Sequence, residues 1–149
     1  MTVRNILVPY DGSPLSKKAL ELGKDISRNF NANLILLMVI PFFFPTSELS
    51  TYAGSSNRDY SKIIKELKRK GTEDIKKVTE KCREEGVKTS YEVIHGDISS
   101  TILKQAKKNK TDLIIIGSRR MLGLGAIKRL GSTARFVSEH AECPVTIVH

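Results

Sequence analysis

The fold of this chain is decided by its first residues, Val3-Arg4-Asn5-Ile6-Leu7-Val8-Pro9 followed by Tyr10-Asp11-Gly12-Ser13-Pro14. The first stretch is typical of a short buried β-strand. The second predicts a tight turn into a helix, because glycine tolerates turn conformations and Ser-Pro suits the N-cap and the first helical position. The apolar residues that follow recur at helical spacing and predict the inner face of that helix: Leu15, Ala19, Leu22, Ile26 and Phe30.

Strand and helix then alternate to the end of the chain. Apolar runs predict four more strands, at residues 33–40, 87–94, 113–116 and 144–148. Apolar residues at helical spacing separate them, and Asp97 suits the N-cap of the helix after the third strand. Strands that alternate with helices pair in parallel through right-handed crossovers. We therefore predict one α/β domain over residues 1–149, a doubly wound parallel sheet with helices on both faces.

The composition is that of a globular domain, because 40% of the 149 residues are hydrophobic and 28% are charged. No segment reaches the roughly 18 uninterrupted apolar residues of a membrane span. We expect no signal peptide, since Met1 to Asn5 leads straight into the first strand. Cys82 and Cys143 stand alone and form no metal or redox motif. These features favour a cytoplasmic protein with reduced thiols.

The net charge of +9 arises from 25 basic against 16 acidic residues. Such a field attracts anionic partners, nucleotides and nucleic acids among them. Between Lys62 and Lys81, however, the lysines are interleaved with acidic residues in the manner of a solvated helix face. Nucleic-acid binding is therefore only a minor hypothesis, and we do not expect it.

Two strand ends carry the small and polar residues of a ligand site. The first strand ends in Pro9-Tyr10-Asp11-Gly12, and the fourth in Gly117-Ser118, with Gly131-Ser132-Thr133 at the start of a later helix. In such sheets ligands bind beyond the carboxyl ends of the strands, where the strand order reverses. Backbone N–H groups at a helix N-terminus bind phosphate, and Asp11 can accept hydrogen bonds from ribose hydroxyls. Each segment alone is better explained as a turn or a helix cap; together they favour a nucleotide site.

A further set of segments lies along the chain in a fixed order: Ile6-Leu7-Val8-Pro9-Tyr10-Asp11-Gly12-Ser13, His95-Gly96-Asp97 with Ile102, Ile116-Gly117-Ser118, Gly131-Ser132 and Cys143-Pro144-Val145. Over essentially the whole chain, their order and spacing resemble the universal stress protein family. The resemblance implies a five-stranded sheet in the order 3-2-1-4-5, which reverses between the first and fourth strands. It also implies, for one branch of the family, ATP binding through a motif of Gly, two residues, Gly, nine residues, Gly, then Ser or Thr.

This sequence departs from that motif at two positions. Counted from Gly117, Arg120 stands where the second glycine belongs and Leu130 where the third belongs, with the Gly-Ser pair one residue later. Arg120 either fills the space of the phosphates or supplies charge to them, and the basic surroundings favour the second interpretation. The basic residues in question are Arg119, Lys128, Arg129 and Arg135.

Carried over position by position, the resemblance implies a site for ATP with Mg²⁺, or with Mn²⁺ in its place. The adenine would lie near Pro9, Tyr10 and the backbone of Val39, and Asp11 would hold the ribose. The phosphates, with the cation riding on them, would be surrounded by Gly117, Arg119, Arg120, Gly131, Ser132 and Thr133.

The sequence offers no catalytic constellation. It contains no Gly-x-x-x-x-Gly-Lys-Ser/Thr stretch, its three histidines are scattered, and no nucleophile stands beside a base. Gly123-Leu124-Gly125 lacks the third glycine of a dinucleotide fingerprint. We therefore expect slow ATP hydrolysis at most, and not a dedicated enzyme.

These observations favour a nucleotide-binding stress-response sensor or regulator. In this hypothesis bound ATP changes residues 41–58 and 119–130, and thereby a surface for unidentified protein partners. The alternative is a nucleotide-free interaction module of the same fold. Either would form a homodimer, because the final strand is predicted at the sheet edge, where Val145 and Ile147 invite pairing with a second chain.

Overall fold

The structure is a computed structural model that describes residues 2–42, 57–118 and 130–149. The expected changes at residues 41–58 and 119–130 fall almost wholly outside these ranges. The elements follow one another as β1 (Asn5–Pro9), α1 (Pro14–Phe30), β2 (Asn33–Ile40), α3 (Asn57–Glu84), β3 (Thr89–His95), α4 (Ile98–Lys108), β4 (Leu113–Gly117), α5 (Ser132–His140) and β5 (Val145–Val148).

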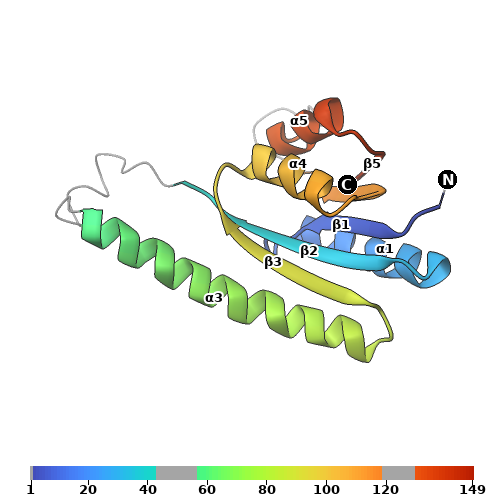
Figure 1. The fold of residues 1–149 in the computed structure, drawn as a ribbon, viewed down its shortest axis with the longest axis horizontal. Helices are drawn as coiled ribbons and strands as arrows, with labels where there is room; N and C mark the ends of the chain where they lie inside the picture. Colours follow the sequence, from blue (N-terminus) through green and yellow to red (C-terminus); the bar gives the residue numbers. More distant parts are fainter. Residues whose placement is uncertain (1, 43–56, 119–129) are drawn as a thin grey trace.

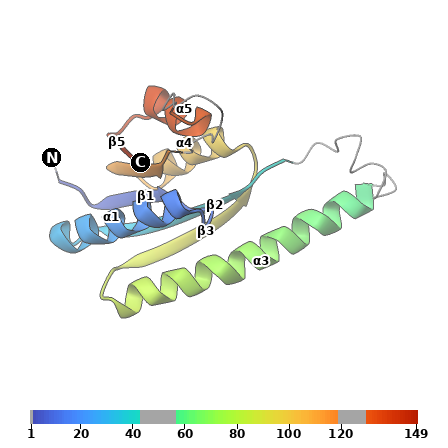
Figure 2. The same ribbon diagram turned by 180° about the vertical axis from the view of Figure 1, so that it is seen from behind.

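The five strands form one parallel sheet in the order β3-β2-β1-β4-β5, which confirms the predicted fold class and strand order. Helices α1 and α3 cover one face of the sheet, and α4 and α5 cover the other (Figures 1 and 2). The direction of winding reverses between β1 and β4, so their carboxyl ends lie side by side. That edge is where a sheet of this kind places a ligand.

Side chains that alternate along the strands fill two cores, one on each face of the sheet. On the face of α1 and α3, Ile6 and Val8 pack with Ile75 of α3. On the face of α4 and α5, Leu7 packs with Ile102 and Val137. All of these side chains are fully buried, so each strand residue has one helix layer to pack against and the sheet has no open face there.

The inner face of α1 agrees with the predicted one at Ala19, which is buried, and at Leu22 and Ile26, which pack against the core, but not at Phe30. Phe30 is 56% exposed, and the buried residues of this helix are Ser16, Ala19, Leu20, Gly23, Lys24 and Ser27. Four of these six residues are small, because the helix lies very close to the sheet: a Cβ on Gly23 would stand 3.1 Å from side-chain atoms of Leu34 and Val8. An apolar pattern alone did not reveal this, since close approach selects for size as well as hydrophobicity.

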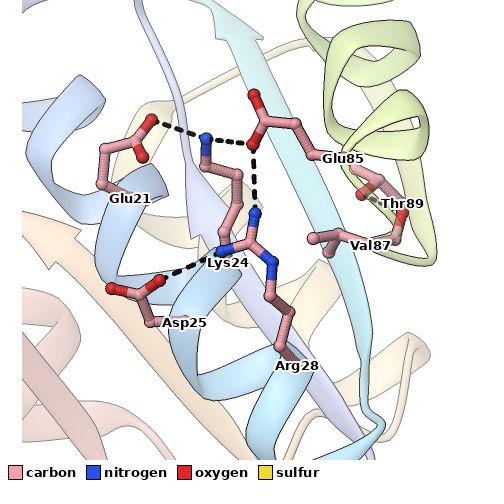
Figure 3. A network of polar contacts seen from close by, with 7 residues as sticks. All are labelled: Glu21, Lys24, Asp25, Arg28, Glu85, Val87 and Thr89. Atoms are coloured by element: carbon pink, nitrogen blue, oxygen red, sulfur yellow. Dashed lines mark hydrogen bonds and ion pairs between the residues drawn. The ribbon is translucent and has the colours of Figure 1, made fainter.

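A charged network ties the end of α1 to the chain that follows α3 (Figure 3). Lys24, only 6% exposed, forms ion pairs with Glu21 at 2.8 Å and with Glu85 at 2.7 Å. Arg28 reaches the same Glu85 carboxylate at 3.2 Å and Asp25 at 3.1 Å. The hydrogen bond from Lys24 is the main cause that lowers the pKa of Glu85. Because α1 runs back against the strands, this network lies at the amino end of the sheet, away from the expected ligand edge.

Candidate functional site

The turn after β1 is built by the side chains of Asp11 and Ser13. Asp11 Oδ1 accepts a hydrogen bond from the Ser13 N–H at 2.9 Å, and Ser13 Oγ accepts one from the Ser16 N–H at 3.3 Å, which caps α1. Gly12 has a φ of +79°, a conformation that glycine adopts without strain. The turn and cap interpretation is thus correct. Asp11 is exposed at this turn, directly after the end of β1.

Tyr10 follows the last residue of β1, but its side chain belongs to the core. The residue is 7% exposed and packs in the cluster beneath α1 and α3, and burial raises the pKa of its hydroxyl. Its backbone N–H donates to the Leu37 carbonyl at 2.8 Å and extends the pairing of β1 with β2 by one bond. What Tyr10 offers to the ligand edge is therefore its backbone, whereas Pro9 stands at the last paired position of β1, opposite Leu37.

Val39 lies in the part of β2 that extends beyond the last residue of β1. The backbone groups of a strand face its two neighbours alternately. Leu37 accepts from Tyr10 on the β1 side, and Ile40 accepts from the Gly96 N–H at 3.0 Å on the β3 side. The N–H and C=O of Val39 therefore face the β1 side. Because Pro9, opposite Leu37, is the last residue of β1, these two groups point to the space just beyond the end of that strand. The side chain of Val39 packs against the core beneath α4 and α5.

Gly117 at the end of β4 is in close contact with the beginning of α1. A Cβ at this position would lie 2.8 Å from the carbonyl carbon and 2.9 Å from the carbonyl oxygen of Leu15. Leu15 sits in the first turn of α1, directly after the turn of Asp11 and Ser13. The structure thus brings together the two strand ends that the sequence selected. The next residue, Ser118, is buried and donates its N–H to the Val148 carbonyl at 2.8 Å.

The N-terminus of α5 has no side-chain cap among the described residues. Gly131 is the N-cap residue, and its carbonyl accepts the first helical hydrogen bond, from the Arg135 N–H at 3.0 Å. Ser132 is exposed and Thr133 half-buried, while Ala134 and Val137 anchor the helix in the core. The first N–H groups of a helix have no partner inside it, so they remain as donors for a ligand or water. Arg119, Arg120, Lys128 and Arg129 lie outside the described residues.

His95, which sequence reasoning left as incidental, is the centre of an aromatic cluster at the end of β3. Its ring meets the ring of Phe42 edge to face at 4.7 Å and lies 6.5 Å from that of Tyr60. Its Nε2 atom is buried and has no hydrogen-bond partner in the described part of the chain. The cluster joins β3, the exit of β2 and the first turns of α3. The strand-end position of His95 before Gly96 was the available signal, but no pattern pointed to its partners.

Within the described ranges, no group of three or more His, Cys, Asp or Glu side chains is placed to hold a metal ion. Among the same residues, no helix is long and apolar enough to cross a membrane.

A model of the universal stress protein family matches residues 2–149 of this chain. The chain belongs to the universal stress protein family. A universal stress protein of Methanocaldococcus jannaschii, MJ0531, is 34% identical over 97% of this chain and 81% of its own length. The Bacillus subtilis universal stress protein YxiE is 33% identical over 96% of this chain and 97% of its own.

Solved universal stress proteins share the fold. UspA from Lactobacillus plantarum superimposes with a TM-score of 0.79 at 23% identity, covering 100% of this chain and 99% of its own. A universal stress protein solved in complex with cAMP has a TM-score of 0.64 at 22% identity, covering 100% and 98%. An Arabidopsis thaliana family member solved with bound AMP has a TM-score of 0.60 at 22% identity, covering 97% and 90%. Some structural neighbours of this chain thus bind adenine nucleotides.

Proposed function

We propose that this protein binds ATP with Mg²⁺ between the carboxyl ends of β1 and β4 and acts as a stress-response sensor or regulator through protein partners in the cytoplasm. The observation that carries the proposal is the contact of Gly117 with Leu15, because it joins the Asp11 turn and the end of β4 at the point where the sheet reverses. The adenine nucleotides bound by two solved relatives support the choice of ligand class.

The phosphates fit the N-terminus of α5. Its free N–H groups and its positive dipole end favour an anion, and no described side chain competes for these donors. Gly131 permits close approach of the phosphates, while the hydroxyls of Ser132 and Thr133 add donors. By charge, Arg119 and Arg120 belong with the phosphates in this proposal. Mg²⁺ commonly keeps several waters and binds through substrate phosphates, so in this proposal the phosphates and water hold the cation.

The nucleoside fits the other half of the edge. The outward N–H and C=O of Val39 form a donor–acceptor pair that suits the adenine edge, and Asp11 accepts from the ribose hydroxyls. Pro9 supplies an apolar contact at the end of β1. The ring of Tyr10 takes no part, since it is buried in the core.

The groups proposed for the site bind and orient the nucleotide, and none of them is a paired acid and base. Asp11 would act as a binding carboxylate, with hydrolysis slow at most. When bound, Mg²⁺ would neutralise phosphate charge. The consequence of binding is then a change of surface that partners read, not turnover.

Calorimetric titration of ATP with Mg²⁺ tests the proposal, with Asp11→Ala and Asp11→Asn compared with the parent chain. Asparagine can still accept the Ser13 N–H, so it preserves the turn while it removes the charge. We expect saturable binding by the parent that is weakened in both variants. The absence of binding by the folded parent protein would refute the nucleotide proposal and favour the nucleotide-free interaction module.

The same proposal includes a homodimer through β5, which is an edge strand of the sheet. Val145 and Ile147 are only half-buried although they pack toward the core, and the outer side of the strand pairs with no other strand in the described part of the chain. Light scattering at micromolar concentration is expected to give twice the mass of 16.6 kDa. The carbonyls of Pro144 and Val148 point to β4, so the backbone groups of Val145 face the outer side by alternation along the strand. Val145→Pro removes an outward backbone donor and is expected to shift the mass toward one chain.

A further inference from the structure

The first described part of α3 differs from the rest of the helix in burial. None of residues 60–70 is buried, whereas Gly71, Ile75, Thr79 and Cys82 are buried against the sheet. The N-terminal turns of the helix extend past the carboxyl ends of β2 and β3 in both views (Figures 1 and 2). Packing on the sheet therefore holds the second half of α3, and the first half stands out from it.

The two halves also differ in charge. Residues 60–70 carry five basic side chains against one acidic, a net charge of +4, while residues 71–84 carry four of each. Four exposed lysines form no ion pair with any described residue: Lys62, Lys65, Lys68 and Lys70. Arg69, in contrast, is held by Glu66 and Glu73. Lysines three apart on one helix repel each other, and Glu66 is the acidic residue of this segment that can offset them.

The same part of the molecule exposes two apolar side chains. Ile63 is 40% exposed, and Phe42, which contacts the His95 ring near Tyr60, is 52% exposed. The remaining apolar residues of the segment, Ile64 and Leu67, are half-buried toward the domain and are not presented for insertion into lipid. Lysine pairs with phosphate and carboxylate alike, but a phosphate backbone would leave Ile63 without an apolar partner. A partner that carries both carboxylates and an apolar side chain matches both the exposed lysines and Ile63.

We infer that residues 60–70 of α3, with Phe42 beside them, form a docking surface for an acidic amphipathic helix of a partner protein. The partner's glutamates or aspartates would meet Lys62, Lys65 and their neighbours, and an apolar side chain would cover Ile63. The proposed function includes unidentified protein partners, and the inference rests on it only because it states the chemistry of one such partner. It does not depend on nucleotide binding, because α3 contributes no residue to the ligand edge proposed above.

The test uses the full chain and a fluorescent synthetic helical peptide with rows of glutamate beside a row of leucine. We expect saturable binding by anisotropy, weaker at higher salt. Lys62→Glu/Lys65→Glu should weaken it at least about tenfold, because two attractive charges become repulsive. Lys76→Glu/Lys77→Glu, in the balanced half of α3, makes the same change in net charge and should leave most of the affinity. Ile63→Ser should weaken binding without altering its salt dependence.

Equal losses in the two double variants would overturn the inference, since they would show that only the overall charge matters. Stronger binding of duplex DNA or of anionic phospholipid vesicles than of the peptide, lost with Lys62 and Lys65, would overturn it in favour of another class of partner. ATP affinity is measured on the same variants and is expected to match the parent. A failure of peptide binding and a failure of nucleotide binding are thus separate results.

Discussion

Substitution of Gly117 by alanine tests the architecture of the ligand edge most directly. The new Cβ would stand 2.8 to 2.9 Å from three atoms of Leu15, two of which are backbone. Ordinary carbon contacts need about 3.5 to 4.0 Å, so the end of β4 and the start of α1 must separate by roughly an ångström or less. Overpacking of this kind costs about 1 to 3 kcal/mol of unfolding free energy. In a chain of this size that corresponds to a fall in Tm of about 2 to 12 °C.

The separation also moves the Asp11 turn away from β4, so Gly117→Ala is expected to weaken ATP binding more than tenfold by calorimetry. Gly23→Ala is the matched control, because its Cβ would press on side-chain atoms of Leu34 and Val8 at 3.1 Å within the same helix–sheet interface but away from the edge. That control should lower stability without changing the affinity for ATP. A Gly117→Ala protein with the parent's Tm would refute the argument from close packing.

Three further predictions concern stability. The folded-state pKa of Glu85 lies below its ordinary value of 4.5, so its ion pairs stabilise the protein above that pH, and this stability is lost as pH falls through the lowered pKa. Urea titrations from neutral to acid pH should therefore show a shallower loss for Glu85→Gln, and curves parallel to those of the parent would contradict the role of the Lys24 network. Ser13→Ala removes the cap of α1 and should lower the unfolding free energy by about 1 kcal/mol in urea denaturation. Ser13→Asp should restore most of that loss, since aspartate also caps helices, and no change in the alanine variant would mean that the Asp11 turn suffices. Tyr10→Ala should cost about 3 to 5 kcal/mol by the same assay, as expected of a large buried ring, while an exposed ring would cost far less.

The sheet was predictable from sequence because its strands are short apolar runs between turn residues, and such runs form only when both faces are covered. Asp97 and Ser13 were recognisable as caps because capping is also local: each side chain accepts a hydrogen bond from the N–H three residues later in the chain. The strand order came from the family resemblance, not from any local pattern.

Contacts between distant residues were not predictable. The aromatic partners of His95 come from the exit of β2 and from α3, and nothing in the local sequence links these segments. Tyr10 was assigned to the ligand edge by position, yet alternation along β1 turns its ring into the core. On the inner face of α1, the apolar pattern did not identify the small buried residues Ser16, Gly23 and Ser27, which the close approach to the sheet requires.

The ion pairs of Lys24 sit at the end of the molecule opposite to the ligand edge, and this separation has an evolutionary consequence. Substitutions at the ends of β1 and β4 can accumulate without weakening the ion pairs that join Lys24 and Arg28 of α1 to Glu85, the residue after α3. Changes at the proposed nucleotide site therefore need not disturb these ion pairs. A variant can thus be altered at one end of the sheet without loss of the ion pairs at the other, although the close packing at Gly117 still links the ligand edge itself to stability.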